Sequence, residues 1–161
     1  MLDTEDMIGA FERNAKVIQM QTQGLSHEQC LLQLPFRGNC MNWVLGHIAV
    51  TRNDVLKVLG EKPVLSEREV ARYRHGSEPV LADGEDVAKL KRLLDVLEHS
   101  QERIAAALKR LGPEDLAEEV ESHLGVTTRA QRLLFLYFHD TYHTAQTELL
   151  RQLAGMNDKM I

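Results

Sequence analysis

The helix-like spacing of apolar residues is the feature that most constrains what this chain can fold into. Apolar side chains recur every three or four residues, whereas strand-like alternation never persists. Four long segments carry this period: residues 3–23, 42–59, 83–111 (or from 84) and 127–155 (or from 128). Glycines mark their ends, at Gly24, Gly60, Gly112 and Gly155. The pattern predicts an all-α protein, with residues 1–161 forming a single domain.

The connection between the second and third segments is long for a simple bundle. It spans residues 61–83, and its Ser66-x-x-Glu69 pattern predicts one short helix. A connection of this length suggests a crossover, so that the helices on either side need not be antiparallel neighbours. We therefore expect a four-helix bundle with a long crossover between helices 2 and 3. Asn42 is the expected N-cap of the second helix.

The fourth segment contains a run, Leu133–Phe138, that is apolar in every direction around a helix axis. A helix of this kind must be covered on all sides. Only one side of a helix faces the core of a four-helix bundle, so the surplus face calls for a partner chain. We predict a homodimer on this basis.

Composition and charge argue against several other classes of protein. The chain is 43% hydrophobic and 27% charged, as expected for a globular domain. A formal net charge of −5 disfavours a nucleic-acid partner, because phosphate binding needs a concentrated basic surface. No apolar run approaches the roughly 18–20 residues that span a bilayer, and the acidic start of the sequence does not resemble a signal peptide. We expect no nucleic acid, no membrane and a cytoplasmic location.

The two cysteines, Cys30 and Cys40, fit neither a Cys-x-x-Cys pattern nor a zinc ribbon. Both lie in apolar surroundings, which favours buried thiols over reactive ones. A disulfide is not expected in a reducing compartment.

Two histidines of the fourth segment have the spacing of metal ligands. His139 and His143 are one turn apart on a helix, so both imidazoles can reach one ion. The spacing alone is weak evidence, because chance gives roughly 0.3 such pairs in a chain of this kind. Histidines that make ordinary hydrogen bonds are the alternative interpretation. The metalloprotease motif His-Glu-x-x-His is excluded because position 140 is Asp.

A third histidine turns the pair into a possible site. His47 lies on a different predicted helix, after Trp43-Val44-Leu45-Gly46, where an imidazole would have few partners. Gly46 carries no side chain and leaves space near the ring. Three histidines from two helices form a facial set with open positions for water or substrate. We therefore predict that His47, His139 and His143 bind a divalent metal ion.

Two segments resemble the motifs of a known family. Residues 42–49, Asn-Trp-Val-Leu-Gly-His-Ile-Ala, closely resemble the second-helix motif of the DinB/YfiT-like metalloenzymes. Residues 139–146 resemble their fourth-helix motif, His-x-x-x-His followed three residues later by Gln. The order of the motifs, the chain length and the long connection also fit. Family members often carry Gly where this chain has Ala145, a small change that leaves the histidines untouched.

The resemblance implies a bundle that is commonly dimeric and holds its metal on His47, His139 and His143. Nickel or zinc is the favoured ion, with manganese or iron as alternatives. The implied reactions are transfer of a low-molecular-weight thiol to an electrophilic small molecule, or metal-dependent hydrolysis. The competing hypothesis is a non-catalytic dimeric protein that binds metal or serves as a stress-linked interaction module. No general base or substrate-binding residue is identified.

Other polar residues are weaker candidates. Asp140 and Gln146 are candidates to accept hydrogen bonds from the ligand imidazoles, and Asp54, two turns beyond His47, is a candidate to line a pocket. A solvated or interface role is at least as plausible for each. The remaining histidines fall on predicted loops or charged helix faces and are interpreted as surface residues: His27, His75, His99 and His123.

Overall fold

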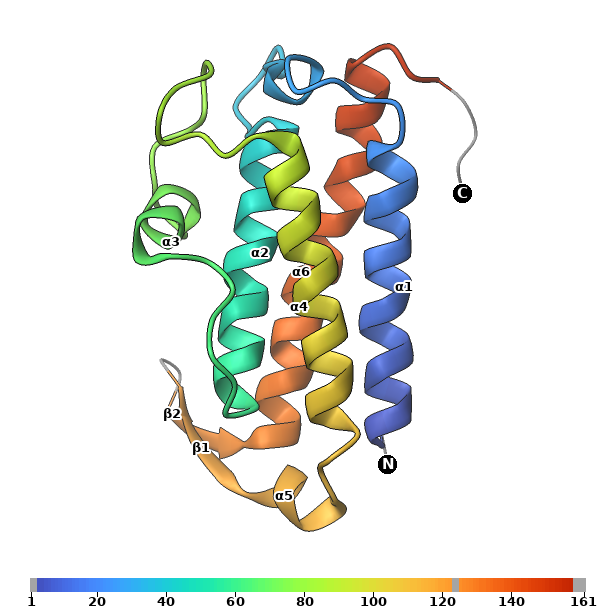
Figure 1. Ribbon diagram of the computed structural model, residues 1–161, viewed down its shortest axis with the longest axis vertical. Coiled ribbons are helices and arrows are strands. Elements are labelled where there is room, and N and C mark those ends of the chain that lie inside the picture. The colour runs from blue at the N-terminus through green and yellow to red at the C-terminus, as the bar shows by residue number, and fades with distance from the viewer. Residues whose placement is uncertain (1–2, 123–124, 158–161) are drawn as a thin grey trace.

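The computed structural model describes residues 3–122 and 125–157, and this part of the chain is mostly helical. Four long helices lie side by side in Figure 1: α1 (Thr4–Thr22), α2 (Met41–Val58), α4 (Leu90–Leu108) and α6 (Arg129–Leu153). Shorter elements connect them: η1 (Gln29–Leu31), α3 (Glu67–Tyr73), α5 (Pro113–Ala117), β1 (Glu119–Ser122) and β2 (Gly125–Thr128).

Each long helix packs against two of the others. Both α1 and α2 contact α4 and α6. In Figure 1, α1 and α6 run in one direction and α2 and α4 in the other, so the chain between α2 and α4, which contains α3, returns along the molecule. As a result α2 and α6, which are far apart in the sequence, lie side by side and antiparallel.

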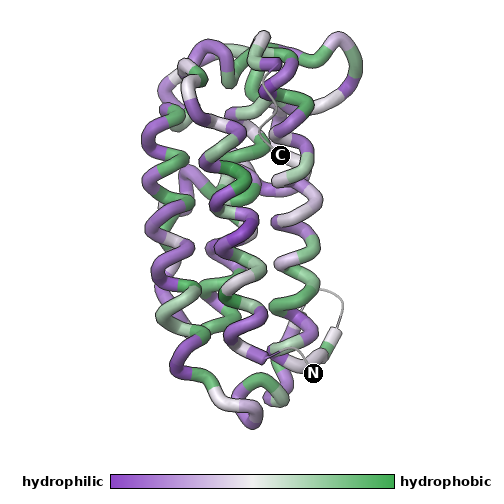
Figure 2. The backbone as a smooth tube through the Cα atoms, turned by 90° about the vertical axis from the view of Figure 1, so that its right-hand side faces the viewer, coloured by the Kyte–Doolittle hydropathy of each residue, from purple (hydrophilic) through white to green (hydrophobic). Residues whose placement is uncertain are grey.

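The core consists of apolar side chains on the inward faces of these helices. Figure 2 shows hydrophilic and hydrophobic segments following one another along the helices in view, as expected for helices with one buried face. Two clusters of buried side chains follow one another along the helices. One cluster contains Trp43, Leu45 and Leu93, and the other contains Phe11 and Leu133.

Capping residues set several helix starts, and the cap of α3 is the one that the sequence predicts. Ser66 and Glu69 form the capping box of α3. The Thr128 hydroxyl caps α6 by accepting from the backbone N–H of Gln131, whose side chain returns the bond. The Asn42 prediction is wrong, because Cys40 is the N-cap of α2. The Asn42 side chain instead donates to the carbonyl of Ala88 and accepts from a tyrosine hydroxyl.

Two other expectations about the third and fourth helices are corrected. Helix α4 begins at Leu90, not at residue 83 or 84, because Gly84 and Val87 close a turn that precedes the helix. The region before α6 contains a small antiparallel sheet, so the described chain is not purely helical. Its strands pair from Glu119 opposite Thr128 to Ser122 opposite Gly125.

No helix among the described residues combines the length and the apolar character that crossing a membrane requires.

Candidate metal centre

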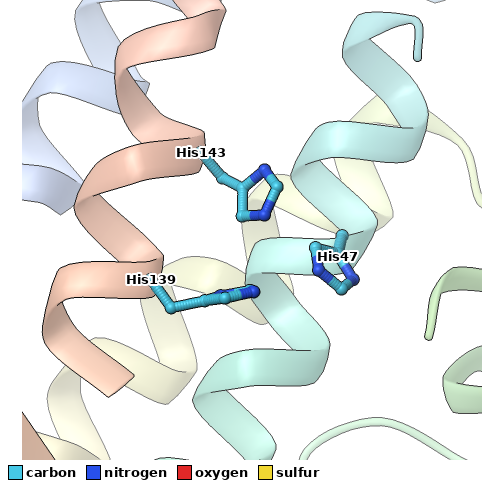
Figure 3. Close-up of side chains that lie close together, drawn as sticks. All are labelled: His47, His139 and His143. Carbon is cyan, nitrogen blue, oxygen red and sulfur yellow. The ribbon is translucent and has the colours of Figure 1, made fainter. Parts of the chain in front are cut away.

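The three predicted histidines lie together on facing sides of α2 and α6. His47 projects from α2, and His139 and His143 project from successive turns of α6, as Figure 3 shows. The ring centroids are 5.0 Å apart for His47 and His139, 4.7 Å for His47 and His143, and 4.6 Å for the two histidines of α6. One nitrogen from each ring lies within 4.8 Å of the other two. The antiparallel packing of α2 and α6 therefore brings the whole predicted set together.

Each imidazole uses its Nδ1 atom for a hydrogen bond within the protein. The Nδ1–H of His47 donates to the carbonyl oxygen of Tyr73 at 2.8 Å. The Nδ1–H of His143 donates to the side-chain oxygen of Gln146 at 2.9 Å. Because these acceptors require a proton on Nδ1, the Nε2 atoms keep a free lone pair.

The hydrogen bonds of Thr51 favour the same tautomer for the third histidine, His139. Its hydroxyl donates to the carbonyl of His47 one turn earlier, at 3.2 Å. With its proton directed to this carbonyl, the hydroxyl oxygen accepts from the Nδ1–H of His139, 2.9 Å away. A single side chain of α2 thus orients a histidine of α6, and all three rings have Nε2 available.

Packing fixes the plane of the His47 ring. The Trp43 ring, one turn earlier on α2, stacks on it with the centroids 4.6 Å apart and an interplanar angle of 22°. The Trp43 indole N–H donates to the hydroxyl of Ser77, which fixes the indole in turn. His47 is therefore held by a stacked ring on one face and by a carbonyl at its edge.

Gly46 has a different role from the one the sequence suggested. A Cβ atom at this position would lie 2.3 Å from the ring carbons of Tyr73. The space beside Gly46 is thus filled by Tyr73, not left open next to His47. The absence of a side chain lets Tyr73 approach α2 closely enough for its carbonyl to reach the imidazole of His47.

Burial keeps the imidazoles in their neutral form. The pKa of His47 is lowered to about 4: burial is the largest cause, the Tyr73 hydrogen bond opposes the shift, and the neighbouring histidines add to it. Burial also lowers the pKa values of His139 and His143. The shifts at all three rings favour the neutral imidazole, which is the form that binds a metal ion.

The donor set fits a divalent transition metal. Three neutral imidazoles with free Nε2 atoms suit zinc, nickel or iron, and each ring has the protein acceptor on its other nitrogen that metal-bound histidines usually have. Three protein ligands also leave room in the coordination sphere for water or another small molecule.

The three weaker candidates from the sequence, Gln146, Asp140 and Asp54, have different surroundings in the structure. Gln146 contacts His143 as expected. The same role for Asp140 is wrong, because its buried carboxylate bonds to Arg52 and Asn14 and not to an imidazole. Asp54 lines a surface pocket with Lys57 and Arg132, at the end of α2 that lies beside the β-hairpin.

Of the remaining histidines, His75 lies close enough to the cluster for its charge to help lower the pKa values of His47, His139 and His143. His75 and His99 are exposed as expected, and His123 lies outside the described residues. His27 is not a surface residue: its side chain is only 13% exposed, contacts Asp83, and accepts from the backbone N–H of Leu90. Cys30 and Cys40 are buried free thiols, as the sequence indicated.

Comparison with known proteins agrees with this architecture. Residues 10–147 match the family model described as the DinB superfamily, so the predicted resemblance is confirmed. Among solved structures, the chain is similar to a conserved protein from Enterococcus faecalis, with a TM-score of 0.71 and 16% identity over 96% of this chain and 98% of that one. At this identity the likeness shows the fold alone. The search of curated proteins found no match.

Proposed function

Because this chain belongs to the DinB superfamily, we propose that it is a divalent-metal-dependent enzyme whose ion is held by His47, His139 and His143. One observation carries the proposal: the three Nδ1 atoms are all engaged within the protein, and one nitrogen of each ring lies within 4.8 Å of the others. Histidines without a common ligand would not be expected to share one tautomer and to point their free nitrogens at the same place.

The proposed chemistry is transfer of a low-molecular-weight thiol to an electrophilic small molecule, with hydrolysis as the second form of the same proposal. A divalent ion at this site supplies a Lewis acid that lowers the pKa of a thiol or water beside it. The protein's own residues orient the ligands: Thr51 and Gln146 hold the tautomers of the α6 histidines, and Trp43 fixes the plane of His47. Nickel and zinc are the favoured ions.

Metal analysis of purified variants tests the site directly. Wild-type protein should contain close to one divalent ion per chain after loading and desalting. His47→Ala and His143→Ala should each lose it while keeping their helical circular dichroism, because the helices are held by the core and not by the ion. His99→Ala is the matched control, since this histidine is exposed on α4 and away from the site. Unchanged metal content in His47→Ala would refute the ligand assignment.

Turnover distinguishes an enzyme from a protein that only binds metal. The loaded protein is assayed with a panel of small thiols and electrophiles, and with ester and amide substrates. Activity that is absent in His143→Ala and present in His99→Ala supports the catalytic proposal. Stoichiometric metal, a large loss of thermal stability on chelation and no turnover would favour the non-catalytic alternative.

We also infer a bundle and a dimer at the level of the whole molecule. The packing of α1, α2, α4 and α6, with α3 in the returning connection, supports a DinB-like four-helix bundle with a crossover between its second and third helices. Exposed apolar side chains on α6 support a homodimer formed through that helix: Leu134, Phe135, Phe138 and Tyr142.

A further inference from the structure

A buried polar cluster links all four long helices. The Arg52 side chain of α2 donates from Nε to Asp140 of α6 at 2.9 Å and from Nη1 to the carbonyl of Leu97 in α4 at 3.1 Å. The other carboxylate oxygen of Asp140 accepts from the Asn14 amide of α1 at 2.9 Å. Both charged side chains of this ion pair are fully buried.

This ion pair lies directly behind the three histidines. Arg52 follows Thr51, which orients His139, and Asp140 follows His139 itself. Successive residues of a helix are turned by about 100°, so the histidine side of α2 and α6 and the ion-pair side are adjacent faces of the same turns. The Arg52–Asp140 pair therefore spans from α2 to α6 at the level where the imidazoles meet.

Stability is a poor explanation for this pair. Removing two charges from water is costly, and replacing a buried ion pair by apolar residues of similar size is often neutral or stabilising. The cluster is also incompletely satisfied, because Nη2 of Arg52 is buried without a hydrogen-bond partner among the described residues. The pair does restrict geometry. A guanidinium group and a carboxylate form hydrogen bonds in only a few relative orientations, whereas apolar side chains can pack in many.

We propose that Arg52 and Asp140 are positioning residues that fix the spacing and register of α2 against α6, and thereby hold His47 within reach of His139 and His143. This inference rests on the proposed metal function. The role of the ion pair is to keep the three histidines in position, not to stabilise the fold.

The test compares two double variants. Arg52→Met/Asp140→Leu removes the pair and fills its volume with apolar atoms. Arg103→Met/Glu61→Leu removes another arginine–carboxylate pair, between α4 and the segment after α2, which does not involve α6. Metal affinity is measured by competition with a chromophoric chelator for Zn²⁺, and ligand geometry by the visible absorption spectrum after loading with Co²⁺. Urea unfolding of the metal-free protein gives stability.

The Arg52/Asp140 variant should unfold at the same or a higher urea concentration than wild type, yet bind Zn²⁺ roughly 10- to 100-fold more weakly, the range for residues that orient metal ligands. Its Co²⁺ spectrum should also change. The Arg103/Glu61 variant should keep both the affinity and the spectrum. An Arg52/Asp140 variant with wild-type affinity and spectrum would overturn the proposal. If this variant does not fold, Arg52→Lys retains the charge without the fork and should show the same loss of affinity.

A measurement without metal separates this inference from the proposed function. In the metal-free protein, NMR should show contacts between the His47 and His139 rings and a proton on Nδ1 of His139. Both signals should disappear in the Arg52/Asp140 variant and persist in the Arg103/Glu61 variant. If wild type binds no metal but the signals behave in this way, the metal function fails and the positioning role stands. Signals that persist in the Arg52/Asp140 variant would refute the positioning role.

Discussion

The residues around His47 show how far the sequence alone could define the site. The three histidines and Gln146 were predictable, because helix spacing and the two motifs place them at fixed positions. Trp43 and Thr51 are each one turn from His47, so the sequence placed them near the ring without indicating their roles. Tyr73 was not predictable, since it comes from the connection 26 residues away and contributes a backbone carbonyl.

The close approach of Tyr73 to Gly46 leads to a prediction at this scale. In Gly46→Ala, the added methyl group would lie 2.3 Å from rigid ring carbons, so Tyr73 must move away. Its carbonyl then loses the bond to His47, and the Tyr73 hydroxyl loses its bonds to Asn42 and Ala88. We expect a loss of about 1–3 kcal/mol in unfolding free energy, typical of overpacking, together with weaker metal binding. Urea unfolding and metal competition measure the two effects.

Gly9→Ala is the matched control for this prediction. A Cβ atom at Gly9, on α1, meets nothing within 4 Å. This variant should keep its metal affinity and be slightly more stable, because alanine favours the helix by up to about 1 kcal/mol. A Gly46→Ala protein as stable as wild type and equally able to bind metal would show that Tyr73 does not position His47.

The two cysteines give a second prediction at this scale. Burial raises the pKa of Cys30 to about 12 and also raises the pKa of Cys40. Because only the thiolate reacts, a disulfide reagent at pH 8 should modify the native protein very slowly and modify two thiols per chain in urea. Leu81→Cys, at an exposed position, should add one rapidly reacting thiol. Rapid modification of native wild-type protein would contradict the buried assignment.

The raised pKa of Cys30 also determines how the stability of the fold depends on pH. An unfolded thiol ionises near pH 9, the ordinary value, whereas folded Cys30 stays protonated up to about pH 12. Its contribution to stability is therefore complete below pH 9 and is lost as the pH rises towards 12.

At the scale of single elements, the helix caps were more predictable than the segments between helices. Local chemistry is enough to fix a capping box, and Ser66–Glu69 forms as the sequence predicts, whereas the Thr128–Gln131 box was not recognised. The start of α4 was placed too early because Val87 continues the apolar spacing, although it is buried from a turn and not from a helix. The hairpin was missed because strands of four residues are too short for an alternating pattern to be recognised.

The cap of α6 can be tested by substitution. Thr128→Ala removes the hydroxyl that accepts from the N–H of Gln131 and leaves that donor unsatisfied. The expected cost is about 1 kcal/mol of unfolding free energy, the typical value for an N-cap. Thr128→Ser keeps a hydroxyl and should stay within a few tenths of a kcal/mol of wild type. Equal urea midpoints for the Ala and Ser variants would exclude a stabilising role for this cap.

At the scale of the whole molecule, α6 has two apolar sides. Leu133 and Leu136 are buried in the core, whereas Leu134, Phe135 and Phe138 are exposed on the opposite side. The continuous apolar run in the sequence therefore serves two environments. One of them is the core, and we propose that the other is a second copy of the chain.

Phe138 is the residue through which to test the dimer. Its side chain is 65% exposed, so a charge there does not disturb the core. Phe138→Asp should convert the proposed dimer to a monomer in size-exclusion chromatography with light scattering, because an unpaired charge in an apolar interface is costly. Leu81→Asp, an equally exposed position in the connection before α4, should leave the mass unchanged. A wild-type monomer at micromolar concentration would refute the dimer.

The pairing of α2 with α6 also has a consequence for how the molecule forms. Thr51 and His139 touch although 88 residues separate them in the chain. Contacts of this range require a large loop to close, and the entropy cost of closure delays them in folding. A chain that has not yet added α6 holds only His47. The complete ligand set therefore exists only in the folded protein, and any ion it binds shifts the folding equilibrium towards the native state in proportion to the ion's concentration.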